Sequence, residues 1–396
     1  MSESNTEINY KEAYEREHEK CADLADKIVV LESEKEDLQF KLDRIKKNKF
    51  WKATGPARSV IHFAQRQKER LSHCGGPKDI LRKIRNKSHQ KSLMESYGTG
   101  SFPDAEQRKK EEETVFPYMP KISILVPLWN NKREFQIQML DCVMNQTYQN
   151  WELCLADGSD AEHAYIEELC KEYAAKSDGR IVYKHLDHNG GISYNTNECY
   201  KLATGDYIGL FDQDDILHPS VLYAYVKEIN EQGADYLYCD ETTFQEDNIN
   251  KMLTMHFKPD YAPDNLRANN YICHFTVIET AFLKELKLRS GFDGAQDYDL
   301  MLRAYAAGGQ FVHVPKVLYH WRCHEASTAS NPQSKRYAYE AGQRALEDYC
   351  LRKGWKATVS GLKHLGFYRE DYEDSVFCQR PEIGIWAKPL PGGRDV

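Results

Sequence analysis

From about residue 121 onward, short apolar runs alternate with longer segments that have a helical pattern. Apolar runs of this length are typical of buried strands. Strands that alternate with helices of this kind predict a parallel sheet with right-handed crossovers. We therefore expect an α/β domain, with strands at 122–126, 151–156, 180–186 and 207–211 and helices at 133–145, 161–176 and 193–203.

Three carboxylates follow the fourth of these strands, at Asp212, Asp214 and Asp215. Like charges this close repel one another and resist removal from water, so a compensating charge is expected. A hard divalent cation meets this need, because Mg²⁺ prefers a few carboxylates together with the phosphate oxygens of a substrate. A solvated acidic turn before a helix near Pro219 explains the same three residues without any ligand.

Other polar residues follow the remaining strands: Asn130 the first, Asp157 the second, and Asn189 and Gly190 the third. In open parallel sheets, ligands bind in the crevice at the carboxyl ends of the strands. The sequence thus predicts a ligand-binding site at the carboxyl ends of the strands, with the acidic cluster at its base. For Asp157, an Asx turn is the structural alternative.

Several short motifs follow one another between residue 121 and about residue 366. They are Ile124-Leu-Val-Pro-Leu-Trp-Asn130, Thr147-Tyr-Gln-Asn-Trp-Glu152, Asp157-Gly-Ser-Asp160, Asn189-Gly-Gly-Ile-Ser193, Asn197, Ala203-Thr-Gly-Asp-Tyr207, Phe211-Asp-Gln-Asp-Asp215, Tyr238-Cys-Asp-Glu241, Phe257-Lys-Pro-Asp260, Gly294-Ala-Gln-Asp-Tyr-Asp-Leu300, Val317-Leu-Tyr-His-Trp-Arg322 and Ser327-Thr-Ala329. In order and spacing they resemble the family 2 glycosyltransferases of the GT-A fold. The later motifs are similar to those of bacterial enzymes that build rhamnan, O-antigen and capsular polysaccharides. Ala156 stands where many members have Asp, and Thr196 where many have Arg, so some donor contacts are expected to differ.

The resemblance implies a GT-A domain at 121–332, with a Rossmann-like, mixed but mostly parallel sheet flanked by helices. It implies that a sugar moves from a nucleotide-sugar donor, a UDP-sugar or dTDP-rhamnose, to a hydroxyl of a glycan acceptor that is lipid-linked. Mn²⁺ or Mg²⁺ would bridge the diphosphate as a Lewis acid. The implied metal ligands are Asp214 as the principal one, with Asp212, Asp215 and His324. The implied donor contacts are Pro127, Trp129, Asn130, Asp157, Asn189, Gly190, Asn197, Asp212, Arg322 and His324.

Two acids, Asp297 and Asp299, are expected at the start of a helix, where they face different ways. The resemblance assigns Asp297 as the base that takes the proton of the acceptor hydroxyl, with inversion at the anomeric carbon. Asp299 is expected to orient the backbone or Arg303. The preference of Asp for helix N-termini explains both acids without catalysis.

A strand is expected at 310–318, and the resemblance implies that the loop after it closes over the diphosphate. Arg322 can pair with phosphate oxygens, and His324 can ligate the metal or donate to phosphate. Trp321 is expected to pack against the core rather than to stack on a sugar. Asp240 and Glu241 end another expected strand, where they either line the site or are merely solvated.

The N-terminal part of the chain has a different character. Residues 1–49 carry about three heptad repeats, which predict a coiled coil and a homodimer, or else a lone amphipathic helix. Residues 50–95 are basic with interleaved apolar residues, which predicts binding to an anionic membrane surface, or else a solvated linker. Residues 96–120 are expected to be a linker, and 333–396 a helical extension with a tail. The heptad residues are Leu24, Ile28, Leu31, Leu38, Leu42 and Ile45, with Lys35 at one seam position.

Bulk properties limit the cellular setting. The net charge of -8 gives no general case for nucleic-acid binding. The eleven cysteines include no Cys-x-x-Cys pair, which favours a reducing cytosol. The sequence has no secretory signal and no apolar run near the roughly 20 residues of a spanning helix. These features predict a cytoplasmic protein that is peripherally associated with the inner face of the cell membrane.

Two other classes of function share some of these features. A nucleotidyltransferase also uses a nucleotide and a carboxylate-bound metal, but usually has a Gly-rich basic loop after the first strand. Here that place is occupied by Pro127-Leu-Trp-Asn-Asn131. A noncatalytic assembly protein built on the coiled coil would have no need for Asp157, Asp214, Asp297 and Arg322 together.

Overall fold

The computed structural model describes residues 97–324, 336–362 and 364–373. The predicted coiled coil at 1–49, the basic segment at 50–95 and the tail from 374 lie outside these residues. The same holds for Ser327-Thr-Ala329. Within the described residues, no helix combines the length and the apolarity needed to cross a bilayer.

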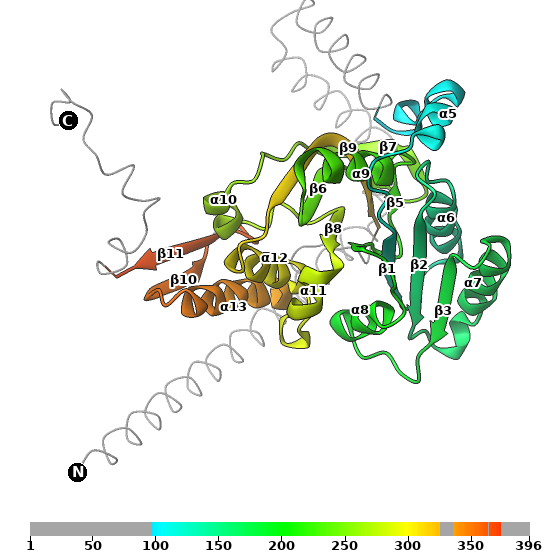
Figure 1. The fold of residues 1–396 in the computed structure, drawn as a ribbon. Coiled ribbons are helices and arrows are strands. Elements are labelled where there is room, and N and C mark those ends of the chain that lie inside the picture. Colours follow the sequence, from blue (N-terminus) through cyan, green and yellow to red (C-terminus); the bar gives the residue numbers. More distant parts are fainter. Residues whose placement is uncertain (1–96, 325–335, 363, 374–396) are drawn as a thin grey trace, which may run out of the picture. The chain divides into compact units, whose positions relative to one another are not determined.

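A mixed sheet forms the centre of the described part (Figure 1). Its order is β3 (Ile181–His185), β2 (Trp151–Asp157), β1 (Ile122–Leu128), β4 (Tyr207–Leu210), β8 (Thr276–Glu279), β6 (Tyr236–Gln245), β9 (Phe311–Cys323) and β5 (Ile216–Leu217), with β7 (Asn248–His256) paired to β6. The four predicted strands, β1 to β4, are all present and parallel. This mixed α/β architecture is consistent with the GT-A expectation.

The expectation of a mostly parallel sheet holds only for the half formed by β3, β2, β1 and β4. Strand β8 runs antiparallel to β4 and β6, and β7 and β5 are antiparallel to their partners. Only the β6–β9 pair is parallel in the second half. The alternation of strands and helices predicts parallel pairing where it is regular, and it stops being regular after residue 210.

Alternate residues of β1 divide the core into two layers. Ile122, Ile124 and Val126 belong to the layer under α6 (Arg133–Met144), α7 (Tyr165–Lys176) and α9 (Val221–Gln232). Leu125 belongs to the layer under α8 (Ile192–Tyr200), α11 (Thr280–Leu286) and α12 (Gln296–Ala306). The alternation places buried side chains on both faces of β1, which is why apolar residues occupy both faces of this strand.

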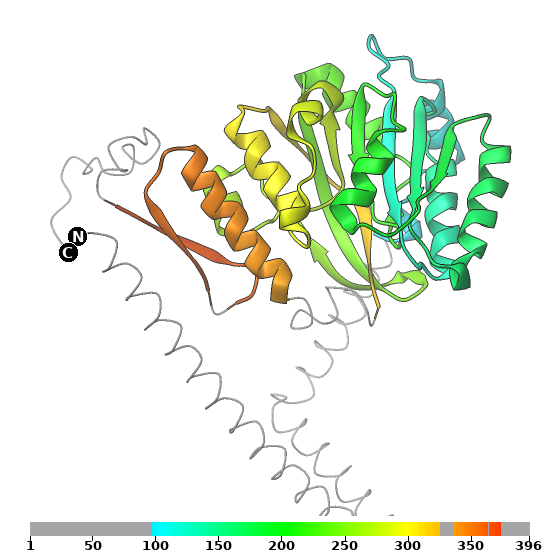
Figure 2. The same cartoon turned by 90° about the horizontal axis from the view of Figure 1, so that it is seen from below.

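The part after residue 333 forms more than the predicted helix. Helix α13 (Arg336–Arg352) ends close to Lys353, where the apolar spacing predicted the end of a helix, and it packs on α12. It is followed by an antiparallel hairpin, β10 (Ala357–Gly361) and β11 (Tyr368–Tyr372), which the sequence analysis did not predict. The hairpin also contacts α10 (Pro263–Ala268). Figures 1 and 2 show α13 and the hairpin, in orange and red, beside α12.

The expected linker at 96–120 contains a short 3₁₀ turn (Thr99–Ser101) and helix α5 (Ala105–Glu113). Asp104 caps α5 by accepting a hydrogen bond from the backbone N–H of Gln107. Glu111 of this helix is buried and accepts a hydrogen bond from the hydroxyl of Thr147. Two further 3₁₀ turns lie at Ala161–His163 and Ser290–Phe292.

Candidate active site

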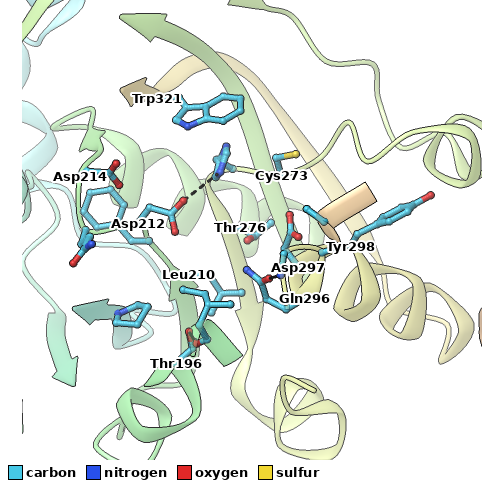
Figure 3. A pocket seen from close by; sticks show the side chains of 18 of the residues that line it. Thr196, Leu210, Asp212, Asp214, Cys273, Thr276, Gln296, Asp297, Tyr298 and Trp321 are labelled. Carbon is cyan, nitrogen blue, oxygen red and sulfur yellow. Dashed lines mark hydrogen bonds and ion pairs between the residues drawn. The ribbon is translucent and has the colours of Figure 1, made fainter. Parts of the chain in front are cut away.

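A cavity of about 810 Å³ opens at the carboxyl ends of β1 and β4. This volume lies within the range of small-molecule sites. Figure 3 shows Asp212 and Asp214 on one side of the cavity and Asp297 and Tyr298 on the other. Seven of the predicted site residues line it, namely Pro127, Trp129, Asn130, Asp212, Asp214, Asp297 and His324.

The loop after β1 is tied to both neighbouring strand ends. The backbone N–H of Trp129 donates to Oε1 of Gln213 at 2.8 Å. Asn130, which has a left-handed φ of 45°, donates its backbone N–H to the hydroxyl of Ser159 and its side-chain amide to Asp160. These bonds hold the exposed indole ring of Trp129 at the rim of the cavity.

The three carboxylates after β4 occupy different environments. Asp212 is half exposed, and Asp214 is hydrogen-bonded to Nε2 of His324 at 2.8 Å. Asp215 is buried and accepts hydrogen bonds from the hydroxyl of Tyr319 at 2.5 Å and from the backbone N–H of Arg322 at 2.7 Å. Burial, together with the charges of Asp214 and Asp212, raises the pKa of Asp215 well above its usual value.

The side chains best placed to hold a cation are Asp212, Asp215 and His274. One ligand atom from each lies within 4.8 Å of the other two. Two carboxylate oxygens and an imidazole nitrogen suit Mn²⁺ or Mg²⁺, and the buried charge of Asp215 is one that a cation would offset. In this arrangement Asp214, predicted as the principal ligand, is bonded to His324 instead.

His274 was missed by the sequence analysis. Its Nδ1 lies 3.1 Å from Oε2 of Glu241, its Nε2 lies 3.7 Å from Asp212, and its ring stacks on Tyr319. Burial opposes the charged form, but the hydrogen bonds and charges of Asp212 and Glu241 prevail and raise the pKa of His274 to about 10. In the sequence His274 is a lone histidine before a strand, with no spacing that relates it to the acids 60 residues earlier.

Arg322 lies outside the cavity, contrary to the loop expected at this position. Strand β9 does not end at Leu318 but continues to Cys323, so consecutive side chains alternate between its faces. Trp321 therefore lines the cavity, whereas Arg322 is buried behind it. The guanidinium donates to the backbone carbonyls of Asp214 and Glu246 and, at 2.7 Å, to the side chain of Gln138. Arg322 thus supports the acidic loop from below.

Four other predicted donor contacts also lie outside the cavity lining. Asp157 is buried and accepts hydrogen bonds from the backbone N–H of Ser159 at 2.9 Å and the hydroxyl of Tyr183 at 2.7 Å, the former being an Asx turn. Asn189 closes a similar turn with the N–H of Gly191. Gly190 and Asn197 are likewise engaged within the protein, Gly190 with Asn195 and Asn197 with the backbone of Leu288.

The two acids of α12 separate as the helical spacing predicts. Asp297 faces the cavity and accepts a hydrogen bond from the side-chain amide of Asn270 at 2.9 Å. Burial raises the pKa of Asp297, and the hydrogen bond from Asn270 only partly counteracts it. Asp299 is buried on the other side, in ion pairs with Arg289 and Arg303. Arg303 was one of the two partners predicted for Asp299.

The cavity also has a wall that the motifs did not indicate. Ala338 and Tyr339 of α13, Gly366, and Tyr368 of β11 line it on the side of Asp297. These residues come from the elements that follow the large sheet in sequence, so no motif near a strand end points to them.

Comparison with known proteins identifies the family. Residues 123–289 match the family described as Glycosyl transferase family 2. The chain is 30% identical to the Putative colanic acid biosynthesis glycosyl transferase WcaA of Escherichia coli over 196 residues. These residues cover 48% of this chain and 68% of that relative. The chain belongs to glycosyl transferase family 2.

Two other relatives are much longer than the region they share with this chain. The Uncharacterized protein y4gI of Sinorhizobium fredii is 38% identical over 242 residues, which cover 60% of this chain and 26% of that protein. The O-antigen biosynthesis protein RfbC of Myxococcus xanthus is 34% identical over 244 residues, which cover 61% of this chain and 19% of that protein. The chain therefore spans only about a quarter or less of the length of these two relatives.

Proposed function

We propose that this protein transfers a sugar from a nucleotide-sugar donor to a hydroxyl group of a glycan acceptor. The observation that carries the proposal is that two different groups of side chains lie on opposite sides of one cavity. A candidate cation-binding group, Asp212, Asp215 and His274, lies on one side, with Asp215 buried behind the lining, and a separate carboxylate, Asp297, lies on the other. A donor diphosphate needs the first and an attacking hydroxyl needs the second.

The donor would lie over the acidic loop. Pro127, Trp129 and Asn130 border this end of the cavity and are available to the nucleotide. A Mn²⁺ or Mg²⁺ ion held by the Asp212–Asp215–His274 group would neutralise charge on the leaving diphosphate. UDP-sugars and dTDP-rhamnose are the donors we propose to test first.

Several sequence-based assignments at this end stay predictions. Asp157 is assigned to the base of the nucleotide, and Asn189, Gly190 and Asn197 to donor contacts. Their hydrogen bonds shape the loops beside Asn130. For Arg322, the side-chain bonds to the acidic loop favour a supporting role over direct contact with phosphate.

Asp297 is the proposed base. Its carboxylate takes the proton of the acceptor hydroxyl as that oxygen attacks the anomeric carbon and the bond to the diphosphate breaks. A base with a raised pKa holds the proton more firmly, which favours the transfer. Attack opposite the leaving group inverts the anomeric configuration.

The acceptor would enter along the wall formed by Tyr339 and Tyr368, next to Asp297. Aromatic rings with hydroxyl groups offer both an apolar face and a hydrogen-bonding tip to a sugar. The names of the relatives, O-antigen biosynthesis protein and colanic acid glycosyl transferase, support a cell-surface polysaccharide as the acceptor. We further propose that this acceptor is lipid-linked, and that residues 1–95 dimerise the protein and hold it at the inner membrane face.

A donor screen tests the proposal. The full-length protein is incubated with a panel of UDP- and dTDP-sugars with Mn²⁺, with Mg²⁺ and with excess EDTA, and the released nucleotide is identified. We expect one donor to yield a nucleoside diphosphate only in the presence of the metal ion, and Asp297→Asn to abolish this turnover. Release of pyrophosphate would instead indicate nucleotidyl transfer, and unchanged activity in EDTA would exclude the metal role.

A further inference from the structure

Behind the candidate metal centre lies a buried ion pair that the proposed chemistry does not use directly. Nζ of Lys258 is 2.8 Å from Oε2 of Glu241, and both side chains are almost fully buried, with exposed fractions of 3% and 4%. A buried ion pair of this kind is weak evidence for stability, because well-packed apolar residues often serve equally well. We therefore looked for a role of this ion pair other than stability in the contacts that Lys258 and Glu241 make.

The ammonium group of Lys258 has three hydrogens, and the structure offers three acceptors for them. Besides Glu241, these are the backbone carbonyls of Ile272 at 2.5 Å and His274 at 2.6 Å. The two carbonyls flank Cys273, whose φ of 40° is unusual for a residue other than glycine. A backbone held in such a conformation persists only where the surroundings enforce it, and it is found mainly at functional sites.

Glu241 fixes the imidazole of His274 in turn. Its Oε2 accepts from Nδ1 of His274 at 3.1 Å, while its Oε1 is 3.0 Å from Nδ1 of His256. An ionised carboxylate can only accept, so the proton of His274 is held on Nδ1. Nε2, the atom directed at Asp212, is then the atom that would coordinate a cation, which would displace its proton, in the arrangement by which carboxylates orient metal-bound histidines.

The same short loop reaches the other side of the cavity. Asn270, three residues before Cys273, donates to the carboxylate of Asp297 at 2.9 Å, and the thiol of Cys273 donates to the carbonyl of Asn270. The loop 270–274 thus touches both the candidate base and the candidate metal centre. Lys258 holds the part of this loop that carries His274.

We infer that Lys258 and Glu241 are positioning residues, which fix the loop 270–274 so that His274 is ready to coordinate the cation and Asn270 to orient Asp297. This inference rests on the proposed function of the cavity. The two residues make different contacts with the loop: Glu241 bonds to the imidazole of His274, and Lys258 bonds to the backbone carbonyls of Ile272 and His274.

The test measures Mn²⁺ binding to the full-length protein by the loss of the free-ion electron paramagnetic resonance signal, which requires no activity. Glu241→Gln and Lys258→Met should each weaken Mn²⁺ binding by about 10- to 100-fold, the usual effect of losing a group that orients a metal ligand. The control, Lys121→Met, removes another Lys–Glu pair, with Glu152 at the opposite end of β2, and should leave Mn²⁺ binding unchanged.

Kinetics then separate the two residues. At saturating Mn²⁺, Glu241→Gln should recover most of the wild-type kcat, whereas Lys258→Met should remain impaired because Asn270 is displaced as well. Wild-type Mn²⁺ affinity in folded Glu241→Gln would overturn the inference, and if Lys258→Met does not fold, Glu241→Gln decides alone. Tight Mn²⁺ binding by the wild type without turnover of any nucleotide sugar would refute the proposed function but not the positioning role.

Discussion

The cavity is bordered by two acidic regions that deal with a buried carboxylate in opposite ways. In the loop after β4, Asp215 is buried with two neutral hydrogen-bond donors, a tyrosine hydroxyl and a backbone amide. In the first turn of α12, Asp299 is buried between two guanidinium groups, of Arg289 and Arg303. The α12 acid is ion-paired with guanidinium groups of the chain, whereas Asp215 accepts its hydrogen bonds from neutral groups and has the charge of His274 nearby.

The difference distinguishes a structural acid from a site acid more reliably than burial does. Asp215 and Asp299 have the same exposed fraction, 1% each, yet only Asp215 belongs to a group that could hold a cation. In each region a second acid, Asp212 or Asp297, faces the cavity. Each region thus combines acids that line the cavity, Asp212 and Asp214 in the loop and Asp297 in α12, with one that is buried.

The largest expected effect is on turnover in Asp297→Asn. Loss of the proposed base should reduce kcat by about 10²- to 10⁴-fold while the donor Kd stays close to that of the wild type. The folded-state pKa of Asp297 is raised, so its ionised form costs stability above the usual aspartate pKa, and the amide removes this cost. Calorimetry at neutral pH should therefore show a Tm no lower than that of the wild type. A large drop in Tm would indicate that Asp297 has a structural role instead of a catalytic one.

The matched variant two residues later should behave in the reverse way. Asp299→Asn removes a carboxylate from the buried guanidinium group of Arg303 and from the partly exposed one of Arg289, which keeps its ion pair with Asp348. This change should lower the free energy of unfolding by about 3–5 kcal/mol. Urea denaturation measures this loss. If instead Asp299→Asn is as stable as the wild type, the contrast between the two acidic regions fails.

A smaller effect is expected in the β4 loop. Mn²⁺ at 100 times its Kd should stabilise the wild-type protein by about 2.7 kcal/mol, and Asp215→Asn should lose most of this gain. Without metal, the variant should be at least as stable as the wild type at neutral pH, because the raised pKa of Asp215 marks an ionised form that is costly to bury. Thermal melts with and without Mn²⁺ give both quantities. An equal gain in both proteins would remove Asp215 from the metal centre.

The smallest effect concerns the pH profile. The proposed base Asp297 must be ionised to accept a proton, so kcat should fall as the pH is lowered through its raised pKa, by at most about tenfold per pH unit. The charge of Asp212 raises this pKa, and His274 and the hydrogen bond from Asn270 lower it. Asn270→Ala should therefore shift the acid limb to higher pH. A shift to lower pH in the pH–rate profile would contradict the assignment.

The first half of the fold and seven residues of the cavity lining could be predicted from the sequence. Apolar residues predominate in strands β1, β2 and β4 because both of their faces are largely covered, and the residues at the strand ends follow from the topology. The opposed directions of Asp297 and Asp299 follow from helical geometry alone. These features depend on local sequence, which is why a single chain reveals them.

The rest depends on contacts between distant segments. The resemblance implied a loop at the end of β9, yet His320 and Arg322 are buried there by partners from other elements, such as Thr242 for His320 and Gln138 for Arg322. His274 and Lys258 carry no local pattern that marks them. Only the folded chain brings them to Asp212 and Glu241.

The wall formed by α13 and the β10–β11 hairpin has a consequence for how enzymes of this kind diversify. Tyr339 and Tyr368 border the cavity, but they lie beyond residue 289, where the match to the family ends, and they contribute no strand to the large sheet. Changes in this segment can alter the shape of one side of the cavity, and they also act on α12, on which α13 packs. Grafting this segment between relatives would test whether it sets the preference for the proposed acceptor.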